Sequence, residues 1–180
     1  IKSEPIDDVS VRKIRGLLVA KGYYEVITYS FIDPEHARLF SDEDFLTLAN
    51  PISTEMSVMR TSLIPGLIQA LQYNLNRQQS RIRLFESGLV FQQPDNLQQT
   101  AKLAGVVYGD IEPEQWDKQT SSSNFFDIKS DIEGILRLFS DIDDVKFVAI
   151  EQKSLHPHQS SQILLNDQVV GILAAVHPSC

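Results

Sequence analysis

The chain has 180 residues, of which 42% are hydrophobic and 22% are charged, as in an ordinary globular domain. It carries 16 Lys and Arg against 24 Asp and Glu, a formal net charge of −8, so it is a poor candidate for binding nucleic acid through its own phosphate contacts. The length fits one domain over residues 1–180, with a core that needs neither a disulfide nor a metal.

The first half of the chain predicts helices separated by short strands. A helix that Asp8 or Ser10 caps carries an apolar stripe and ends at Gly22. The following segments are strands at 23–31, 46–50 and 57–60, a short helix that begins at Asp33 and Pro34, and a long amphipathic helix over 64–75.

The second half predicts hairpins and one more helix. The expected elements are paired strands at 81–91 and 103–108 around a polar loop, a polar loop over 111–124, a helix over 126–139, a strand at 145–150 and a hairpin of 162–165 with 169–176 around Asn166 and Asp167. Strands outnumber helices and most connections are short. The expected fold is α+β, with a mainly antiparallel sheet and helices packed on it.

Cysteine, histidine and hydropathy exclude several classes of site. The single cysteine, Cys180, can build neither an intrachain disulfide nor a cysteine-based zinc site, and a reducing, cytoplasmic setting is compatible with this. His156 and His158 are close in sequence, but Pro157 between them favours a loop over a metal site. No apolar run is long enough to span a membrane, and no signal peptide is recognisable. The chain starts without Met, so we expect a piece of a longer protein.

No nucleophile or phosphate-binding motif stands out. Glu86, Ser87 and Gly88 do not form a nucleophile elbow, and the glycines are scattered singly. Acidic pairs such as Asp7 and Asp8 read as helix caps and solvated charge.

Several short segments, taken in order, resemble one family. They are KGYYEV (21–26), NPIS (50–53), MRTSL (59–63), NLNR (74–77), FESGLVF (85–91), FDIK (126–129), LHP (155–157) and VHP (176–178). The ordered set resembles the β chain of bacterial phenylalanyl-tRNA synthetase, whose core domain is similar to a class II aminoacyl-tRNA synthetase core. The positions that match the family's motifs are Arg60, Arg77, Glu86, Gln92, Asp127 and His156.

The resemblance implies a supporting role. In this family the α chain carries the active site, and the β chain contributes a catalytically silent core that packs on it in an (αβ)₂ assembly. ATP and magnesium serve the whole enzyme, tRNA is bound mostly through other domains, and this domain is expected to hold no cofactor or metal. Motif 1-type helices build the interface, which here corresponds to Val11, Ile14, Leu17, Leu18, Tyr23 and Tyr24. Periodicity alone makes the helix stripe an ordinary core face.

The sequence departs from the class II catalytic pattern at one decisive position. An arginine usually follows the motif 2 strand and neutralises ATP phosphates, but Gln92 stands there, and a neutral amide cannot replace a guanidinium fork. The motif 1 proline position is Tyr29, and the third motif has no match.

The arginines near the long helix allow two interpretations. They are Arg60, Arg77, Arg81 and Arg83. They form either a remnant phosphate or tRNA site, or ion pairs with carboxylates such as Glu55 and Glu86, and the net charge favours the ion pairs. For the domain as a whole, a silent scaffold is the first hypothesis. An active adenylate-forming domain and a small-molecule regulatory domain that reuses a dead synthetase pocket are the alternatives.

Overall fold

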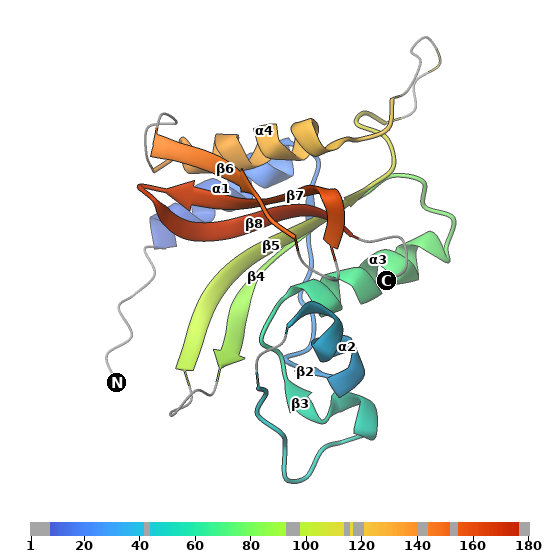
Figure 1. Cartoon of the computed structure of the whole chain (residues 1–180). Coiled ribbons are helices and arrows are strands. Elements are labelled where there is room, and N and C mark those ends of the chain that lie inside the picture. The colour runs from blue at the N-terminus through green and yellow to red at the C-terminus, as the bar shows by residue number, and fades with distance from the viewer. Residues whose placement is uncertain are drawn as a thin grey trace. The chain divides into compact units, whose positions relative to one another are not determined.

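The structure is a computed structural model that describes residues 8–41, 44–92, 98–113, 116, 121–139, 144–151 and 155–176. The chain forms two compact units (Figure 1). The central unit is continuous and comprises residues 23–110, and the split unit combines residues 1–22 with 111–180. The expectation of one domain over 1–180 stays a prediction.

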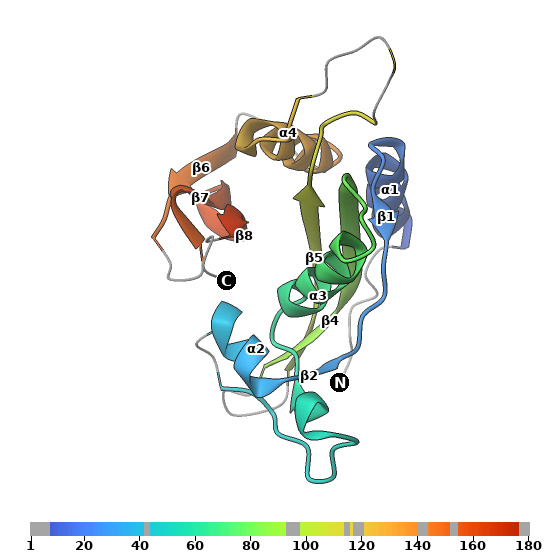
Figure 2. The ribbon, with the colours of Figure 1, turned by 90° about the vertical axis from the view of Figure 1, so that its right-hand side faces the viewer.

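The central unit is built on a three-stranded sheet of order β1-β4-β5. β4 (Ile82–Gln92) and β5 (Gln98–Tyr108) form a long antiparallel hairpin, and β1 (Tyr24–Glu25) runs parallel to β4. α3 (Ile64–Leu75) lies along one face of this hairpin (Figure 2). Its apolar stripe and the proline in its first turn are what the sequence predicts.

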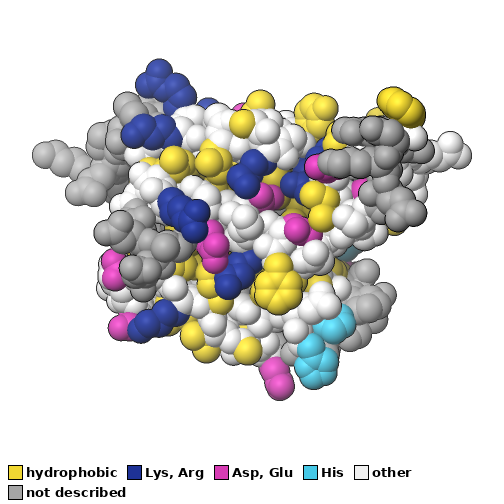
Figure 3. Space-filling model, turned by 90° about the horizontal axis from the view of Figure 1, so that it is seen from above, with side chains coloured by type: hydrophobic (Ala, Val, Ile, Leu, Met, Phe, Trp, Pro, Cys, Tyr) yellow, Lys and Arg dark blue, Asp and Glu magenta, His cyan; other side chains and the backbone are white. Residues whose placement is uncertain are grey.

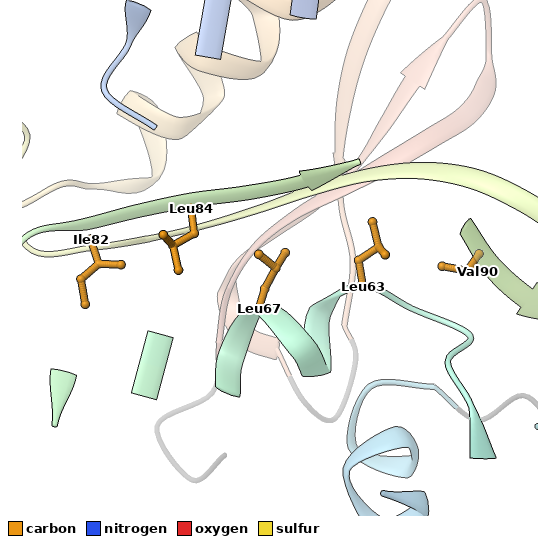
Figure 4. Close-up of a cluster of buried hydrophobic side chains, with 5 residues drawn as sticks. All are labelled: Leu63, Leu67, Ile82, Leu84 and Val90. Carbon is orange, nitrogen blue, oxygen red and sulfur yellow. The ribbon is translucent and has the colours of Figure 1, made fainter. Parts of the chain in front are cut away.

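The core of the central unit lies between α3 and β4. Leu63 and Leu67 from the helix side meet Ile82, Leu84 and Val90 from the strand (Figure 4). The three strand residues are separated by even numbers of positions, so they share one face of the pleated sheet. This packing fixes which face of β4 points toward α3.

A smaller layer lies beside this core. β2 (Phe31–Ile32) and β3 (Val58–Met59) pair antiparallel, and they are accompanied by α2 (Pro34–Phe40) and the short 3₁₀ helix η1 (Thr54–Met56). The Asp33 side chain accepts a hydrogen bond from the backbone N–H of Glu35, which confirms Asp33 as the α2 cap. Ile32, Ala37 and Val58 form the second buried cluster.

The split unit packs helices on an antiparallel sheet. Its sheet has the order β6-β7-β8, from β6 (Val145–Ala149), β7 (Leu155–Leu165) and β8 (Gln168–Val176). α1 (Asp8–Ala20) packs on α4 (Phe125–Leu136), and Lys129 of α4 lies over the Phe147 ring of β6. The β7–β8 turn places Asn166 and Asp167 at φ values of 51° and 62°, the left-handed conformation that two-residue hairpin turns require.

Several predicted boundaries are wrong. Residues 23–31 form no continuous strand, because the chain pairs with β4 only at β1 and then turns away before β2. Residues 46–50 contribute a single bridge, Thr47 to Val58. His156 and His158 lie in β7 and not in a loop, at an irregular stretch between Leu155 and Ser160. Of the polar loop predicted over 92–99, Gln92 lies in β4 and Gln98 and Gln99 lie in β5, and residues 93–97 lie outside the described residues.

Candidate functional site

Three side chains form a buried polar cluster in the central unit, the Arg60–Glu86–Thr28 network. Arg60 Nη1 donates to Glu86 Oε1 at 2.7 Å and approaches Thr28 Oγ1 at 3.0 Å, and Arg60 Nε donates to the Leu89 carbonyl at 2.9 Å. The Thr28 hydroxyl donates to Glu86 Oε2 at 2.7 Å. Arg60 is 5% exposed and Glu86 is 2% exposed, so both charges are removed from water.

Backbone pairing holds the network in place. Arg60 directly follows β3, its N–H donates to the Ser30 carbonyl, and its own carbonyl accepts from the Phe91 N–H. Glu86 lies in β4, between Leu84 and Gly88 on the face toward α3. The network therefore joins β3, the segment after β1 and the middle of β4.

Two glycines make room for it. A Cβ at Gly88 would lie 2.5 Å from Arg60 Nη2 and 3.3 Å from Glu86 Oε1, and a Cβ at Gly66 would overlap Thr28 Oγ1. Contacts this short are not tolerated between packed atoms, so both positions require glycine for close approach. The guanidinium fills the space above Gly88 and is directed at the chain's own carboxylate.

The sequence favours ion pairs between the arginines near α3 and carboxylates such as Glu55 and Glu86, and the pair of Arg60 with Glu86 is of this kind. The other arginines near α3 are placed differently. Arg77 lies over the Tyr73 ring, with 3.4 Å from its Cζ atom to the ring centroid, and Arg83 lies over the Tyr23 ring at 5.4 Å.

The remaining motif positions serve local structure. Gln92 ends β4 and is half-buried. Asp127 belongs to a capping box at the start of α4, where its carboxylate accepts from the Asn124 N–H at 2.8 Å. In β7, His156 Nδ1 accepts from the His158 N–H at 3.3 Å, and the His156 carbonyl accepts from the Ser160 hydroxyl at 2.6 Å. Of the six motif positions, the structure brings Arg60 and Glu86 together. Within the central unit, Arg77 follows α3 and Gln92 ends β4, and within the split unit Asp127 lies in the first turn of α4 and His156 lies in β7.

The residues expected at an interface lie on and after α1. Val11, Ile14 and Leu17 are half-buried and Leu18 is buried, and Leu17 approaches Gly134 of α4. Tyr23 is buried, whereas Tyr24 is 72% exposed. The stripe thus serves the packing of α1 within the split unit, and its role in an interface stays a prediction.

Sequence reasoning missed several of these residues. Thr28 carried no signal, because its role depends on a glutamate 58 residues away. The ion pair of Lys21 with Asp131, 2.7 Å long, likewise could not be inferred from the sequence, because the two residues are 110 positions apart. The Asn124 cap could have been found, since Asn followed three residues later by Asp before an apolar helix has the form of a capping box.

Metal ligands among the described residues, and charge on one face of the molecule, indicate no further site. The described residues contain no group of three or more His, Cys, Asp or Glu side chains that could hold a metal ion. On the face shown in Figure 3, Lys and Arg side chains are interspersed with Asp and Glu among the described atoms, so this face carries no continuous basic patch. None of the described helices is long and apolar enough to cross a membrane.

Comparison with known proteins identifies the family. The model of the phenylalanyl tRNA synthetase beta chain CLM domain matches residues 3–180. A phenylalanine–tRNA ligase beta subunit of Pseudomonas syringae pv. tomato is 50% identical over 168 residues, which cover 92% of this chain and 21% of that subunit. The corresponding subunit of Yersinia pestis is 46% identical over 176 residues, covering 94% of this chain and 22% of the subunit. The chain therefore spans about a fifth of the length of these relatives.

The fold is also found in a solved synthetase. A pyrrolysyl tRNA synthetase from Desulfitobacterium hafniense matches 92% of this chain and 55% of its own length, with a TM-score of 0.61 and 15% sequence identity. This likeness concerns the fold alone, and it confirms the predicted α+β, synthetase-like architecture. The family match over nearly the whole sequence shows that this chain belongs to the phenylalanyl-tRNA synthetase β chain CLM domain family.

Proposed function

We propose that this domain is a catalytically silent, synthetase-like scaffold. It packs on the catalytic α chain and supports assembly of the enzyme that attaches phenylalanine to tRNA. ATP and magnesium act at the α chain of the whole (αβ)₂ enzyme, in the cytoplasm. The family match and the names of the relatives, which are β subunits of a ligase, support this assignment.

The single observation that carries the silent role is the closed Arg60–Glu86–Thr28 network. Adenylate formation requires cations that face the ATP phosphates and the developing negative charge. Arg60 instead donates to Glu86 and to the Leu89 carbonyl, and it is buried. At the end of β4, where a class II enzyme would offer an arginine by resemblance, the chain has Gln92. At these two described positions the chain therefore does not offer the cations that a bound ATP–magnesium complex requires.

Light scattering on a sizing column tests the scaffold role. The domain is measured alone and after mixing with the family's α chain, and in parallel as part of the full-length β subunit. We expect a stable mixed species with the α chain. We also expect no heat of ATP binding to the isolated domain in titration calorimetry. The proposal is contradicted if neither the isolated domain nor the full-length β subunit binds the α chain and the isolated domain binds ATP.

A further inference from the structure

An unusual stretch of sequence surrounds α3. From Met56 to Phe85 the chain contains no Asp, no Glu and no Lys, although its net charge is −8. The charged residues of this stretch are the four arginines. Arg60 and Arg83 are buried and Arg81 is half-buried, so Arg77 is the exposed one. The exposed side of α3 is consequently free of acidic side chains in an acidic protein.

Three exposed side chains lie on α3 and in the turn that follows it. Gln69 and Tyr73 are four residues apart on α3, on the face opposite the one that packs on β4, and Arg77 lies in the turn just after the helix, against Tyr73. Tyr73 is 57% exposed. Gln69 also contacts α2, because its Nε2 lies 3.1 Å from His36 Nδ1. We call Gln69, Tyr73 and Arg77 the α3 stripe.

The guanidinium of the α3 stripe is held in one orientation. The Arg77 Cζ atom lies 3.4 Å from the centroid of the Tyr73 ring, and Arg77 Nη1 donates to the Tyr73 carbonyl at 3.2 Å. Among the described residues, no carboxylate forms an ion pair with Arg77. A guanidinium has five N–H donors in a rigid fork, so most of its donors remain available to an incoming group. The arginine is preordered, which lowers the entropy lost on binding.

Backbone strain lies next to this arginine. Gln78 has φ of 62°, in the left-handed region that glycine ordinarily occupies after a helix. Strain of this kind persists where surrounding structure or function requires it. The exposed part of the stretch from Met56 to Phe85 contains Tyr and Arg and lacks Lys, Glu and Asp. Residues that contribute most of the binding energy at protein interfaces have a similar composition.

We propose that the α3 stripe is a docking surface for a protein partner that presents a carboxylate to Arg77, and that this partner is the catalytic α chain. The choice of the α chain rests on the proposed function. A carboxylate accepts two parallel N–H bonds from a guanidinium, and Tyr73 supplies a flat apolar surface beside it. A nucleic acid fits less well, because one exposed arginine in a chain of net charge −8 supplies little attraction for a phosphate backbone.

The test uses the full-length β subunit and the α chain. The dissociation constant of the two chains is measured by analytical ultracentrifugation for wild type, Arg77→Ala, Arg77→Lys and Tyr73→Leu. We expect Arg77→Ala and Tyr73→Leu to weaken association about 10- to 100-fold. Arg77→Lys should also weaken it, because an ammonium lacks the fork. Lys102→Ala, which removes an exposed cation from β5, is the matched control and should change the constant by less than about twofold.

Hydrogen exchange on the same proteins supplies a second measurement. Residues 69–80 should become protected when the α chain is added to the β subunit, and circular dichroism shows that each variant is folded. Protection of these residues already in the free β subunit would mean that its other domains cover the stripe, which contradicts the proposal.

The affinity data separate this proposal from the scaffold role itself. If wild type binds the α chain and the stripe variants bind equally well, the docking surface lies elsewhere and the scaffold role stands. If wild type does not bind the α chain, both fail. If the variants lose tRNA in a filter-binding assay while their subunit affinity is unchanged, the stripe is a nucleic-acid surface and the proposal is overturned.

Discussion

At the scale of single residues, the Arg60–Glu86–Thr28 network shows how buried charges depend on one another. Removing a charge from water is costly, and the partner's attraction and hydrogen bonds offset that cost only when all are in place. Arg60 and Glu86 meet this condition through the bonds to each other, to Thr28 and to the Leu89 carbonyl. Removing both charges together should therefore change the free energy of unfolding little, whereas removing either one alone should lower it strongly.

We expect Glu86→Leu to destabilise the domain by about 3–5 kcal/mol, because it leaves the Arg60 guanidinium buried and unpaired. The double variant Arg60→Met with Glu86→Leu should lose far less than the sum of the two single changes. Urea unfolding followed by circular dichroism measures each free energy of unfolding. Additive single effects would contradict a coupled network.

Two glycines offer a paired test of close packing. Gly88→Ala places a methyl group against Arg60 Nη2 and should cost about 1–3 kcal/mol of unfolding free energy. Gly16→Ala in α1 meets no atom within 4 Å and should instead stabilise the domain by about 0.5–1 kcal/mol, through helix propensity. Thermal unfolding of both variants measures the two effects, and equal effects would refute the packing argument.

At the scale of elements, the start of α4 depends on Asn124. Its side chain accepts from the N–H groups of Phe126 and Asp127, and Asp127 returns a bond to the Asn124 N–H. Asn124→Ala should cost about 1 kcal/mol, whereas Asn124→Ser, which keeps a capping oxygen, should cost less. Chemical denaturation gives both values, and equal losses for Ala and Ser would show that the cap does not operate.

The β6–β8 sheet contains a pH-dependent contact. The hydrogen bond from Lys146 Nζ to Asp167, 2.7 Å long, and the charge of Asp167 raise the pKa of Lys146 above its ordinary value of 10.5. A raised folded-state pKa contributes stability that is complete below the unfolded-state pKa and is lost as pH rises through the folded-state value.

The stability difference between wild type and Lys146→Met should therefore shrink as the pH rises from about 9 to about 12. The pair is exposed, so the difference is small and falls further with added salt. Unfolding midpoints measured across this range check the sign. A difference that grows with pH would contradict it, and Lys146→Met with Asp167→Asn should show almost no pH dependence.

Local patterns predicted most elements, and tertiary contacts explain the failures. The stripes of α1 and α3, Gly22 after α1, the proline in the first turn of α3 and the turn residues of the β7–β8 hairpin all lie within a few positions in the sequence. Asp8 and Ser10, the predicted caps of α1, instead lie within the helix. The segment 23–31 has strand-forming residues throughout, but the bonds of Thr28 to Glu86 divert it from the sheet. The charge pattern also favoured ion pairs of the arginines near α3 with carboxylates such as Glu86, and Arg60 forms such a pair. It could not predict Thr28 or the space that Gly66 and Gly88 provide, because those depend on how β4 meets α3.

At the scale of the whole molecule, the central unit has everything that independent folding requires. It is continuous in sequence, and it contains both the α3–β4 core and the cluster of Ile32, Ala37 and Val58. We expect residues 23–110, expressed alone, to unfold cooperatively in urea and to keep slow hydrogen exchange in β4. Deleting residues 1–22 should spare this unit and loosen α4, which loses Lys21 and Leu17 as partners. A fragment 23–110 with the spectrum of an unfolded chain would contradict this expectation.

The division of the split unit has a consequence during synthesis on the ribosome. Lys21 and Asp131 are 110 residues apart in the chain, so α1 emerges long before α4 exists. At about 5–20 residues per second, this gap amounts to about 5–20 s. Throughout that time Val11, Ile14, Leu17 and Leu18 have no α4 to cover them, while the central unit can already fold. Until residues 125–136 are translated, the nascent chain thus exposes the apolar stripe of α1, a surface of the kind that holdase chaperones bind.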